Sequence, residues 1–337
     1  MKAIGYTTPG TIDRADALVD IEMAKPSAIG HDILVKVAAV SVNPVDTKVR
    51  GNRAPEGTSP AILGWDAVGE VAEIGELVSE FKVGDKVWYA GAINRSGTNA
   101  EYHLVDARIV GHAPKSIKTA AAAALPLTAL TAQEMIFDRL KVDVPVAGAA
   151  NAIVIIGGAG GVGSIAIQLL RAQTDLTIIA TASRTETQDW VKELGAHHVL
   201  DHSKPLPEQV AALGIGAPAF VFSTTHSDSY LTQIAEFIAP QGRFGLIDDP
   251  AVLDIVPFKV KAVSVHWELM FTRSLFGTAD MARQGKILDA VAALIDAGKV
   301  RSTATDTFGV INADNLKRAH ALIESGKAKG KVVLEGF

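Results

Sequence analysis

The sequence predicts an α/β protein in which a doubly wound parallel sheet is joined to a second domain with the character of an antiparallel β-barrel. Its length of 337 residues suits two domains. β-branched segments separated by glycines fill the first third of the chain, and strand and helix patterns alternate from about residue 150 onward. Such alternation is typical of a parallel sheet covered by helices.

The first third is expected to form antiparallel strands. β-branched residues dominate segments 33–42, 68–74 and 83–89, and glycines such as Gly75 and Gly84 stand where turns or bulges would. After Lys118 alanines and leucines recur at helical spacing, which predicts a helical connector.

Strands and helices then alternate up to about residue 247, and the tail from about Phe271 is expected to hold two amphipathic helices and a last strand, Lys331–Leu334. The alternating segments are predicted as strands 152–156, 177–181, 198–200, 220–223 and 242–247, and helices 162–172, 187–195 and 229–238.

Composition excludes several classes of protein. Hydrophobic residues make up 48% of the chain and charged residues 20%, so a packed core is expected rather than disorder. The formal charge of −5 gives no overall attraction to a polyanion, and we expect no nucleic-acid partner. The chain has no cysteine, which excludes disulfides, thiolate nucleophiles and zinc sites with cysteine ligands.

No membrane association is expected. The most apolar stretch, Ala120–Ala132, is short and contains Pro126. The first residues show no basic leader with an apolar core. We therefore expect a soluble, cytoplasmic protein.

A glycine-rich loop follows the strand predicted at 152–156 and runs directly into a helix. Gly158, Gly160 and Gly163 match G-x-G-x-x-G in the strand, turn and helix context that a Rossmann dinucleotide-binding domain requires. The glycines allow a tight turn, close approach of a pyrophosphate and close packing of helix on strand, and the anion sits at the positive end of the helix. An ordinary turn is the competing interpretation. The residues predicted to bind the cofactor here are Gly158, Ala159, Gly160, Gly161, Val162 and Gly163.

The residues after the second strand of this domain favour NADP(H) over NAD(H). An NAD site carries an acid about 20 residues after the loop, to bind the ribose 2′-hydroxyl. Here the sequence has Ser183 and Arg184, and the first acid is Glu186. A serine donates a hydrogen bond and an arginine binds phosphate bidentately, whereas an acid would repel it. Arg184 as a solvated loop charge is the alternative.

The order of several motifs carries a family resemblance. The chain resembles the medium-chain dehydrogenase/reductase superfamily over nearly its whole length. Within it, the chain is most similar to the zinc-free quinone oxidoreductase branch and to bacterial proteins called zinc-type alcohol dehydrogenase-like. Beside the glycine loop, the motifs are Val42–Asp46, Gly64–Gly69, Val83–Val87, Leu127–Ala132, Ile247–Pro250, His266–Arg273 and Gly330–Leu334.

The resemblance implies a domain plan. Residues 1–127 and 270–337 would form a GroES-like catalytic domain, residues 128–269 would form the Rossmann domain, and two chains would form a homodimer. It also implies further cofactor contacts, and it would put Lys331 at a phosphate. The positions it assigns to the cofactor are His202, Phe222, Ser223, Ile247, Asp248, Phe271 and Lys331.

One departure from the zinc-dependent relatives bears on chemistry. Those relatives place a cysteine where Asn43 stands and a histidine–glutamate pair where Trp65 and Asp66 stand. We therefore expect no metal. The histidines at 197, 198 and 202 flank a short strand of the nucleotide domain and are not assigned as ligands.

Four residues are candidates for the reaction centre. The resemblance implies that Asn43 contacts the nicotinamide carboxamide or the substrate oxygen, and that Thr131 contacts the nicotinamide ribose or amide. An Asx turn at Asn43 and a hydroxyl bonded to its own helix at Thr131 are the alternatives. Trp65 is expected either to line the substrate pocket or to lie in the core. Asp46 could orient the loop or relay a proton, although a solvated or capping carboxylate is the favoured interpretation.

The function that these observations favour is zinc-independent hydride transfer from NADPH to a quinone or an α,β-unsaturated carbonyl. Delocalisation spreads the charge that develops on oxygen, so no metal is needed to hold it. No tyrosine stands at a motif that would make it a proton donor, so solvent is expected to protonate the product. The alternatives are an alcohol or aldehyde dehydrogenase and a non-catalytic NADPH-binding protein.

Overall fold

A computed structural model describes residues 1–57 and 59–337 of the chain. It divides into two compact units. The first unit comprises Met1–Leu130 and Phe271–Phe337, and the second comprises Thr131–Met270. The chain thus leaves and re-enters the first unit a little beyond the predicted boundaries at residues 127 and 269.

Two sheets form the first unit, and in both of them neighbouring strands are mostly antiparallel. A small sheet has the order β2-β1-β4, and a seven-stranded sheet has the order β15-β16-β3-β5-β6-β8, with β7 paired to β3. The long strand β3 therefore has three partners, β16, β5 and β7. The strands are β1 (Lys2–Tyr6), β2 (Val19–Glu22), β3 (Asp32–Val42), β4 (Ala61–Ile62), β5 (Ala67–Ile74), β6 (Lys86–Tyr89), β7 (Tyr102–Asp106), β8 (Gly111–His112), β15 (Ala304–Thr307) and β16 (Lys331–Glu335).

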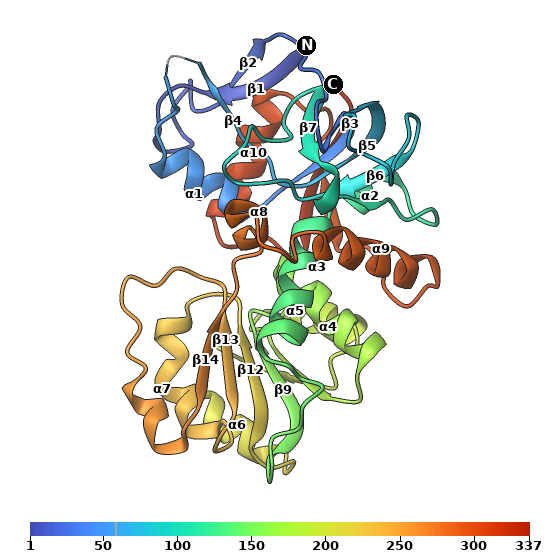
Figure 1. The fold of residues 1–337 in the computed structure, drawn as a ribbon. Helices are drawn as coiled ribbons and strands as arrows, with labels where there is room; N and C mark the ends of the chain where they lie inside the picture. The colour runs from blue at the N-terminus through green and yellow to red at the C-terminus, as the bar shows by residue number, and fades with distance from the viewer. Residues whose placement is uncertain (58) are drawn as a thin grey trace. The chain divides into compact units, whose positions relative to one another are not determined.

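The helices of the first unit lie around this large sheet (Figure 1). Helix α2 contacts β3, β5 and β16, and α9 contacts β8 and β6. The start of α3 belongs to this unit, and its last three residues belong to the second unit. The helices are α1 (Pro44–Asn52), α2 (Thr119–Ala123), α3 (Pro126–Gln133), α8 (Thr272–Phe276), α9 (Arg283–Asp296) and α10 (Ala313–Glu324).

The second unit is a six-stranded parallel sheet with the order β11-β10-β9-β12-β13-β14. The central strand β9 is an apolar run that is buried from Ala152 to Ile156, as expected for a parallel strand covered on both faces. Figure 1 shows α4 and α5 on one side of this sheet and α6 and α7 on the other. The elements are β9 (Ala150–Ile156), α4 (Gly161–Gln173), β10 (Thr177–Thr181), α5 (Thr185–Glu193), β11 (His198–Leu200), α6 (Leu206–Ala212), β12 (Pro218–Ser223), α7 (Ser227–Phe237), β13 (Arg243–Leu246) and β14 (Ser264–Trp267).

The predicted α/β class and parallel sheet are confirmed, with local corrections. The strand predicted at 83–89 begins only at Lys86, because Val83–Asp85 forms a turn in which Gly84 has φ +93° and Val83 is exposed. Helix α6 and strand β14 were not predicted. The tail also contains α8 and β15 beside the two expected helices.

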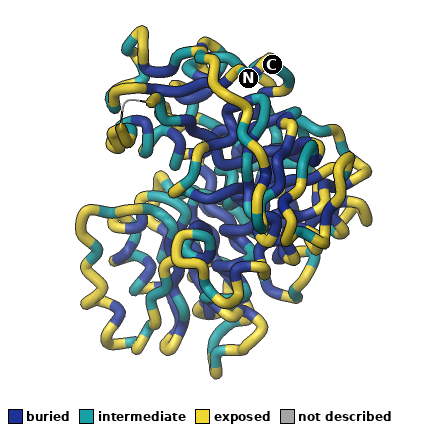
Figure 2. The backbone as a smooth tube through the Cα atoms, turned by 45° about the horizontal axis from the view of Figure 1, so that its top comes forward, coloured by how far each residue is buried: buried dark blue, intermediate teal, exposed yellow. Residues whose placement is uncertain are grey.

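The connector consists of α2, α3 and a π-helix, Glu134–Arg139, which follows α3 directly. By length and composition alone, Thr119–Arg139 could cross a membrane, in contrast to the expectation for Ala120–Ala132. However, 78% of its most apolar window is buried inside the structure, as in the core helix of a soluble protein. The burial map in Figure 2 shows buried backbone running through the interior of each unit.

Candidate functional site

The glycine loop lies at the carboxyl edge of the parallel sheet, between β9 and α4. Strand order places β9 beside β12 at the centre of the sheet, where α/β proteins of this plan bind ligands. A Cβ added to Gly163 would stand 2.4 Å from the Gly157 carbonyl oxygen, so helix and loop meet at a distance that only glycine permits. A Cβ on Gly160 would meet only that same oxygen, at 3.5 Å, and the loop is therefore open there. These residues fit a bound diphosphate at the start of α4.

Thr181, the last residue of β10, holds this loop. Its hydroxyl accepts the Gly157 N–H at 3.1 Å, and its carbonyl accepts the Gly158 N–H at 3.1 Å. The same hydroxyl lies 3.1 Å from Nδ1 of His202, which follows β11. Thr181 was not among the residues predicted from the sequence, although its place at the end of the strand beside the glycine loop indicates such a contact.

Ser183 and Arg184 follow β10 on the exposed surface at the same edge. Arg184 donates from Nε to Glu186 at 2.6 Å, and both side chains of this ion pair are substantially exposed. An exposed pair of this kind contributes little energy, so a phosphate could replace the carboxylate partner. Burial lowers the pKa of the half-buried His202, and its imidazole is therefore expected to be neutral at physiological pH.

The predicted residues beyond the loop also follow or end strands at this edge. Ser223 ends β12, and Ile247 and Asp248 follow β13. Asp248 accepts hydrogen bonds from both the backbone N–H and the hydroxyl of Ser227, the first residue of α7. Asp248, which the resemblance assigned to the cofactor, thus has a protein partner at the start of a helix. Phe222 is fully buried within β12.

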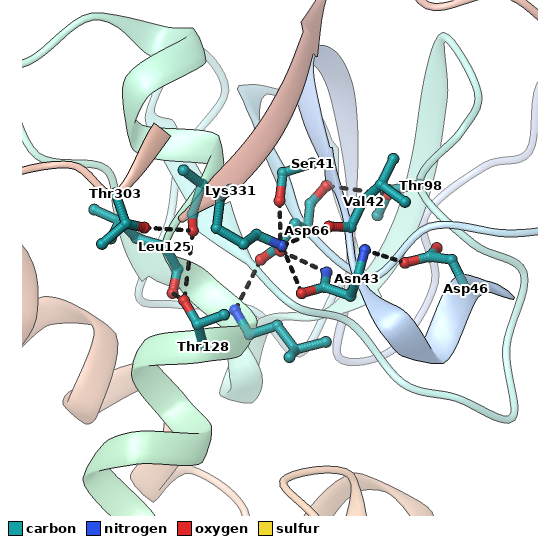
Figure 3. A network of polar contacts seen from close by, with 12 residues as sticks. Ser41, Val42, Asn43, Asp46, Asp66, Thr98, Leu125, Thr128, Thr303 and Lys331 are labelled. Atoms are coloured by element: carbon teal, nitrogen blue, oxygen red, sulfur yellow. Dashed lines mark hydrogen bonds and ion pairs between the residues drawn. The ribbon is translucent and has the colours of Figure 1, made fainter. Parts of the chain in front are cut away.

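A second group of predicted residues forms a buried polar cluster in the first unit, centred on Asp66 (Figure 3). Asp66 is 0% exposed, and its carboxylate accepts hydrogen bonds from three sides. The Ser41 hydroxyl and the Asn43 amide donate to Oδ2 at 2.8 and 2.7 Å, and the Leu127 N–H donates to Oδ1 at 2.8 Å. Lys331 lies 3.2 Å from the same carboxylate. Burial raises the pKa of Asp66, opposed by the ammonium and these donors.

The phosphate role expected for Lys331 does not agree with its surroundings. The side chain is 3% exposed, and its ammonium donates to the Val42 carbonyl, the Asn43 amide oxygen and Asp66. Three N–H groups are thus used within the protein, and none remains for a phosphate. The sequence could not show this contact, because Lys331 and Asp66 are far apart along the chain.

Asp46 is a capping carboxylate, but a buried one. It accepts the backbone N–H of Asn43, the residue that precedes α1, at 2.7 Å, and it is 1% exposed. Burial raises its pKa to about 7, while Lys331 and the Asn43 N–H oppose the shift. The capping interpretation is confirmed, and the solvated one is wrong because the carboxylate is inside the protein.

Trp65 and Phe271 pack against each other in the first unit. Their ring centroids are 6.1 Å apart in an edge-on arrangement, and each side chain is 2% exposed. The Trp65 indole donates to the Ala92 carbonyl at 3.3 Å. This burial agrees with the core interpretation of Trp65. Thr131, the first residue of the second unit, is buried.

Two of the three histidines near β11, His197 and His202, have protein partners. His197 accepts the Ile178 N–H at Nδ1 and contacts Arg171 through Nε2, and His202 contacts Thr181. Within residues 1–57 and 59–337, no group of three or more histidine, aspartate or glutamate side chains is arranged to hold a metal ion.

Comparison with known proteins identifies two family domains in the chain. Residues 30–115 match the alcohol dehydrogenase GroES-like domain, and residues 194–334 match the domain described as zinc-binding dehydrogenase. A zinc-type alcohol dehydrogenase-like protein of Staphylococcus aureus (strain MSSA476) is 39% identical, and the match covers 99% of each chain.

Two solved structures have the same fold. A protein from Rhizobium etli CFN 42, described as a candidate zinc-dependent alcohol dehydrogenase, is 62% identical, with a TM-score of 0.99 over 100% of this chain and 98% of that one. The Escherichia coli quinone oxidoreductase in complex with NADPH is 20% identical, with a TM-score of 0.83 over 99% and 100% of the two chains.

Proposed function

Because the chain belongs to the medium-chain dehydrogenase/reductase superfamily, whose members are nicotinamide-dependent oxidoreductases, we propose that it is a zinc-independent reductase that uses NADPH to reduce quinones or α,β-unsaturated carbonyls. When bound, the nicotinamide supplies a hydride to an electron-poor carbon. The chain's own residues would bind and orient the cofactor and the acceptor and exclude water from the reacting atoms.

The observation that carries the cofactor proposal is the carboxyl edge of the sheet in the second unit. Neighbouring parallel strands end in the glycine loop, in Ser183 with Arg184, and just before His202. The loop offers main-chain N–H groups at the start of a helix, which suit a diphosphate. An exposed arginine beside a serine suits a 2′-phosphate better than a free ribose hydroxyl. The cofactor phosphates would be held by these residues.

The buried cluster in the first unit supports the zinc-independent part of the proposal. The amide of Asn43 is committed to Asp66 and Lys331, and the chain has no cysteine to offer a metal. One N–H of the Asn43 amide has no partner among these contacts, so the amide could give at most one hydrogen bond to a carboxamide or a substrate oxygen. With such limited charge stabilisation, acceptors that spread negative charge themselves, as quinones and enones do, suit the chain better than simple aldehydes.

A direct assay tests the proposal. NADPH and NADH oxidation would be measured against a panel of quinones and enones and a panel of aldehydes, each with and without a chelator. We expect faster turnover of the first panel, a preference for NADPH and no effect of the chelator. Chelator-sensitive turnover of aldehydes would instead support an alcohol dehydrogenase, the class to which the Rhizobium etli protein is assigned. Cofactor binding without turnover of either panel would indicate a binding protein.

A further inference from the structure

The ammonium of Lys331 occupies an enclosed cation position in the first unit. It lies 2.8 Å from the Val42 carbonyl oxygen, 2.5 Å from the Asn43 amide oxygen and 3.2 Å from Asp66 Oδ2. A carboxylate, an amide oxygen and a main-chain carbonyl thus surround one positive charge. Figure 3 shows the side chain of Lys331 reaching from β16 into this group. All three ammonium hydrogens have an acceptor.

Asp66 needs this cation. A carboxylate that is 0% exposed has lost its hydration. The free-energy cost of this loss is large unless a positive charge and hydrogen-bond donors replace the water. Ser41, Asn43 and Leu127 supply three neutral donors, and Lys331 supplies the charge. Asp46, also buried nearby, adds negative rather than positive charge to the surroundings when it is ionised.

The same pair of charges fixes the orientation of Asn43. An ammonium can only donate a hydrogen bond, and an ionised carboxylate can only accept one. The amide oxygen of Asn43 must therefore face Lys331, and its NH₂ group must face Asp66, as observed. Without the ammonium, only Asp66 would orient the amide, and the amide oxygen would lose its charged donor.

Asp66 in turn holds the start of α3. Leu127 is the second residue of that helix, and its N–H lies in the first turn, where backbone N–H groups take acceptors from outside the helix. The carboxylate accepts this N–H and lies at the positive end of the helix. Lys331 thus stabilises an anion that directly precedes β5 and bonds to Ser41 of β3 and Leu127 of α3.

We propose that Lys331 is the resident cation of this cluster and a positioning residue for Asn43 and Asp66, and that the space left when its side chain is shortened takes up an alkylammonium ion from solution. The proposal does not depend on the cofactor or on the substrate of the enzyme. It makes the cluster a cation site that the chain fills with its own side chain.

Chemical rescue tests the proposal. Lys331→Ala removes the equivalent of n-propylammonium. We expect Tm to fall by about 10 °C, the result of leaving a buried carboxylate without its charge partner, and to rise again, with saturation, as n-propylammonium chloride is added. Tetramethylammonium, which cannot donate hydrogen bonds, should give no such rise. The wild-type protein and Lys36→Ala, which removes an exposed lysine from β3, should not respond to n-propylammonium.

A second pair of variants covers the case in which Lys331→Ala does not fold. Lys331→Met keeps most of the volume but leaves Asp66 unpaired, and Lys331→Met/Asp66→Asn removes both charges. We expect the double variant to melt at a higher temperature than Lys331→Met at pH 8, and the difference to shrink at low pH as Asp66 takes up a proton. A double variant no more stable than Lys331→Met at pH 8, or a Lys331→Ala protein that ignores n-propylammonium, overturns the proposal.

Discussion

At the scale of single residues, the Thr181 hydroxyl links two parts of the proposed cofactor site. It accepts the Gly157 N–H, so its own proton is free to be donated to Nδ1 of His202. That donation would leave the proton of the neutral imidazole on Nε2, where it could be given to a phosphate. One hydroxyl would thus orient both the glycine loop and a candidate phosphate ligand.

Thr181→Val keeps the shape of the side chain and removes the hydroxyl. We expect the affinity for NADPH to fall about fivefold to tenfold, as for the loss of one hydrogen bond, and the affinity for NADH to fall less, because NADH has no 2′-phosphate for His202. Fluorescence titration with both cofactors measures the two values. Thr174→Val, which removes a hydroxyl that bonds to the Leu170 carbonyl and the Leu176 N–H at the far end of α4, is the matched control. Equal losses for both cofactors would show that Thr181 does not act through His202.

Asp46 gives a pH-dependent contribution to stability. Its pKa is raised to about 7 in the folded protein from 3.8, so between about pH 4 and pH 7 the folded chain keeps a proton that the unfolded chain loses. The contribution of this group to stability therefore falls as the pH rises through that window. Asp46→Asn cannot lose a proton, so its stability relative to the wild-type protein should increase by at most about 1.4 kcal/mol per pH unit from pH 4 to 7 and then level off.

Urea unfolding of both proteins at a series of pH values measures this difference. Ser229→Ala, at an exposed residue of α7 whose side chain does not titrate in this window, should show no such change. A constant difference between Asp46→Asn and the wild-type protein across the window would mean that Asp46 titrates near its normal pKa.

At the scale of elements, two glycines in the loop between β9 and α4 have different roles. A Cβ at Gly163 would meet the backbone oxygen of Gly157 at 2.4 Å and the Cα of Gly158 at 2.7 Å, neither of which can move aside easily. A Cβ at Gly160 would make only an ordinary contact of 3.5 Å. The first position is limited by packing of helix on strand, and the second is left open toward the proposed diphosphate.

The two alanine variants should therefore differ. We expect Gly163→Ala to lower Tm and to weaken cofactor binding, because α4 must move away from the loop. Gly160→Ala should melt near the wild-type temperature and still bind NADPH at least tenfold more weakly, because its methyl group would occupy space that the diphosphate needs. Differential scanning fluorimetry and NADPH titration measure the two effects. Normal NADPH affinity in Gly160→Ala would place the diphosphate elsewhere.

Elements with a strong local pattern could be predicted from the sequence, and those without one could not. The apolar run of β9 and the glycines after it predict the strand, the loop and the start of the helix together. They do so because the turn and the close packing of α4 on the loop require glycine. Strand β14 contains a histidine and an exposed tryptophan and has no strand-like alternation. It could therefore not be predicted from its own residues, and it is recognised in the structure by its pairing with β13. The turn at Val83–Asp85 was predicted as strand because Val83 is β-branched, although its side chain is exposed.

The site residues divide in the same way. The position of Ser183 and Arg184 just after β10 could be predicted, because they follow a recognisable strand at a known offset from the glycine loop; their contact with a cofactor stays a prediction. The contact of Lys331 with Asp66 could not, because it depends on β16 pairing with β3 across most of the length of the chain. Sequence spacing carries no information about such a pairing. The phosphate role predicted for Lys331 was wrong for that reason.

At the scale of the whole molecule, β14 is the edge strand of the parallel sheet, and no further strand of residues 1–57 or 59–337 pairs with it. Trp267 on this strand is 56% exposed, and the segment before it presents further apolar side chains to solvent. The exposed apolar residues of this edge region are Val252, Ile255, Val256, Val260, Trp267 and Leu269. An unpaired edge with apolar neighbours favours association, and a two-fold axis would bring two β14 strands together. We propose that the chain forms a homodimer through this edge.

Val260→Asp tests the proposed dimer, because Val260 is 94% exposed and a charge there should leave the fold of the single chain intact. In the dimer, the same substitution would bury an aspartate from each chain in an apolar interface, which costs far more than leaving it in water. We expect sedimentation velocity to give a dimer for the wild-type protein at micromolar concentration and a monomer for Val260→Asp. Val83→Asp, at an exposed valine of the first unit, should remain a dimer. A monomeric wild-type protein, or a Val260→Asp dimer as tight as the wild-type one, would exclude this edge as the interface.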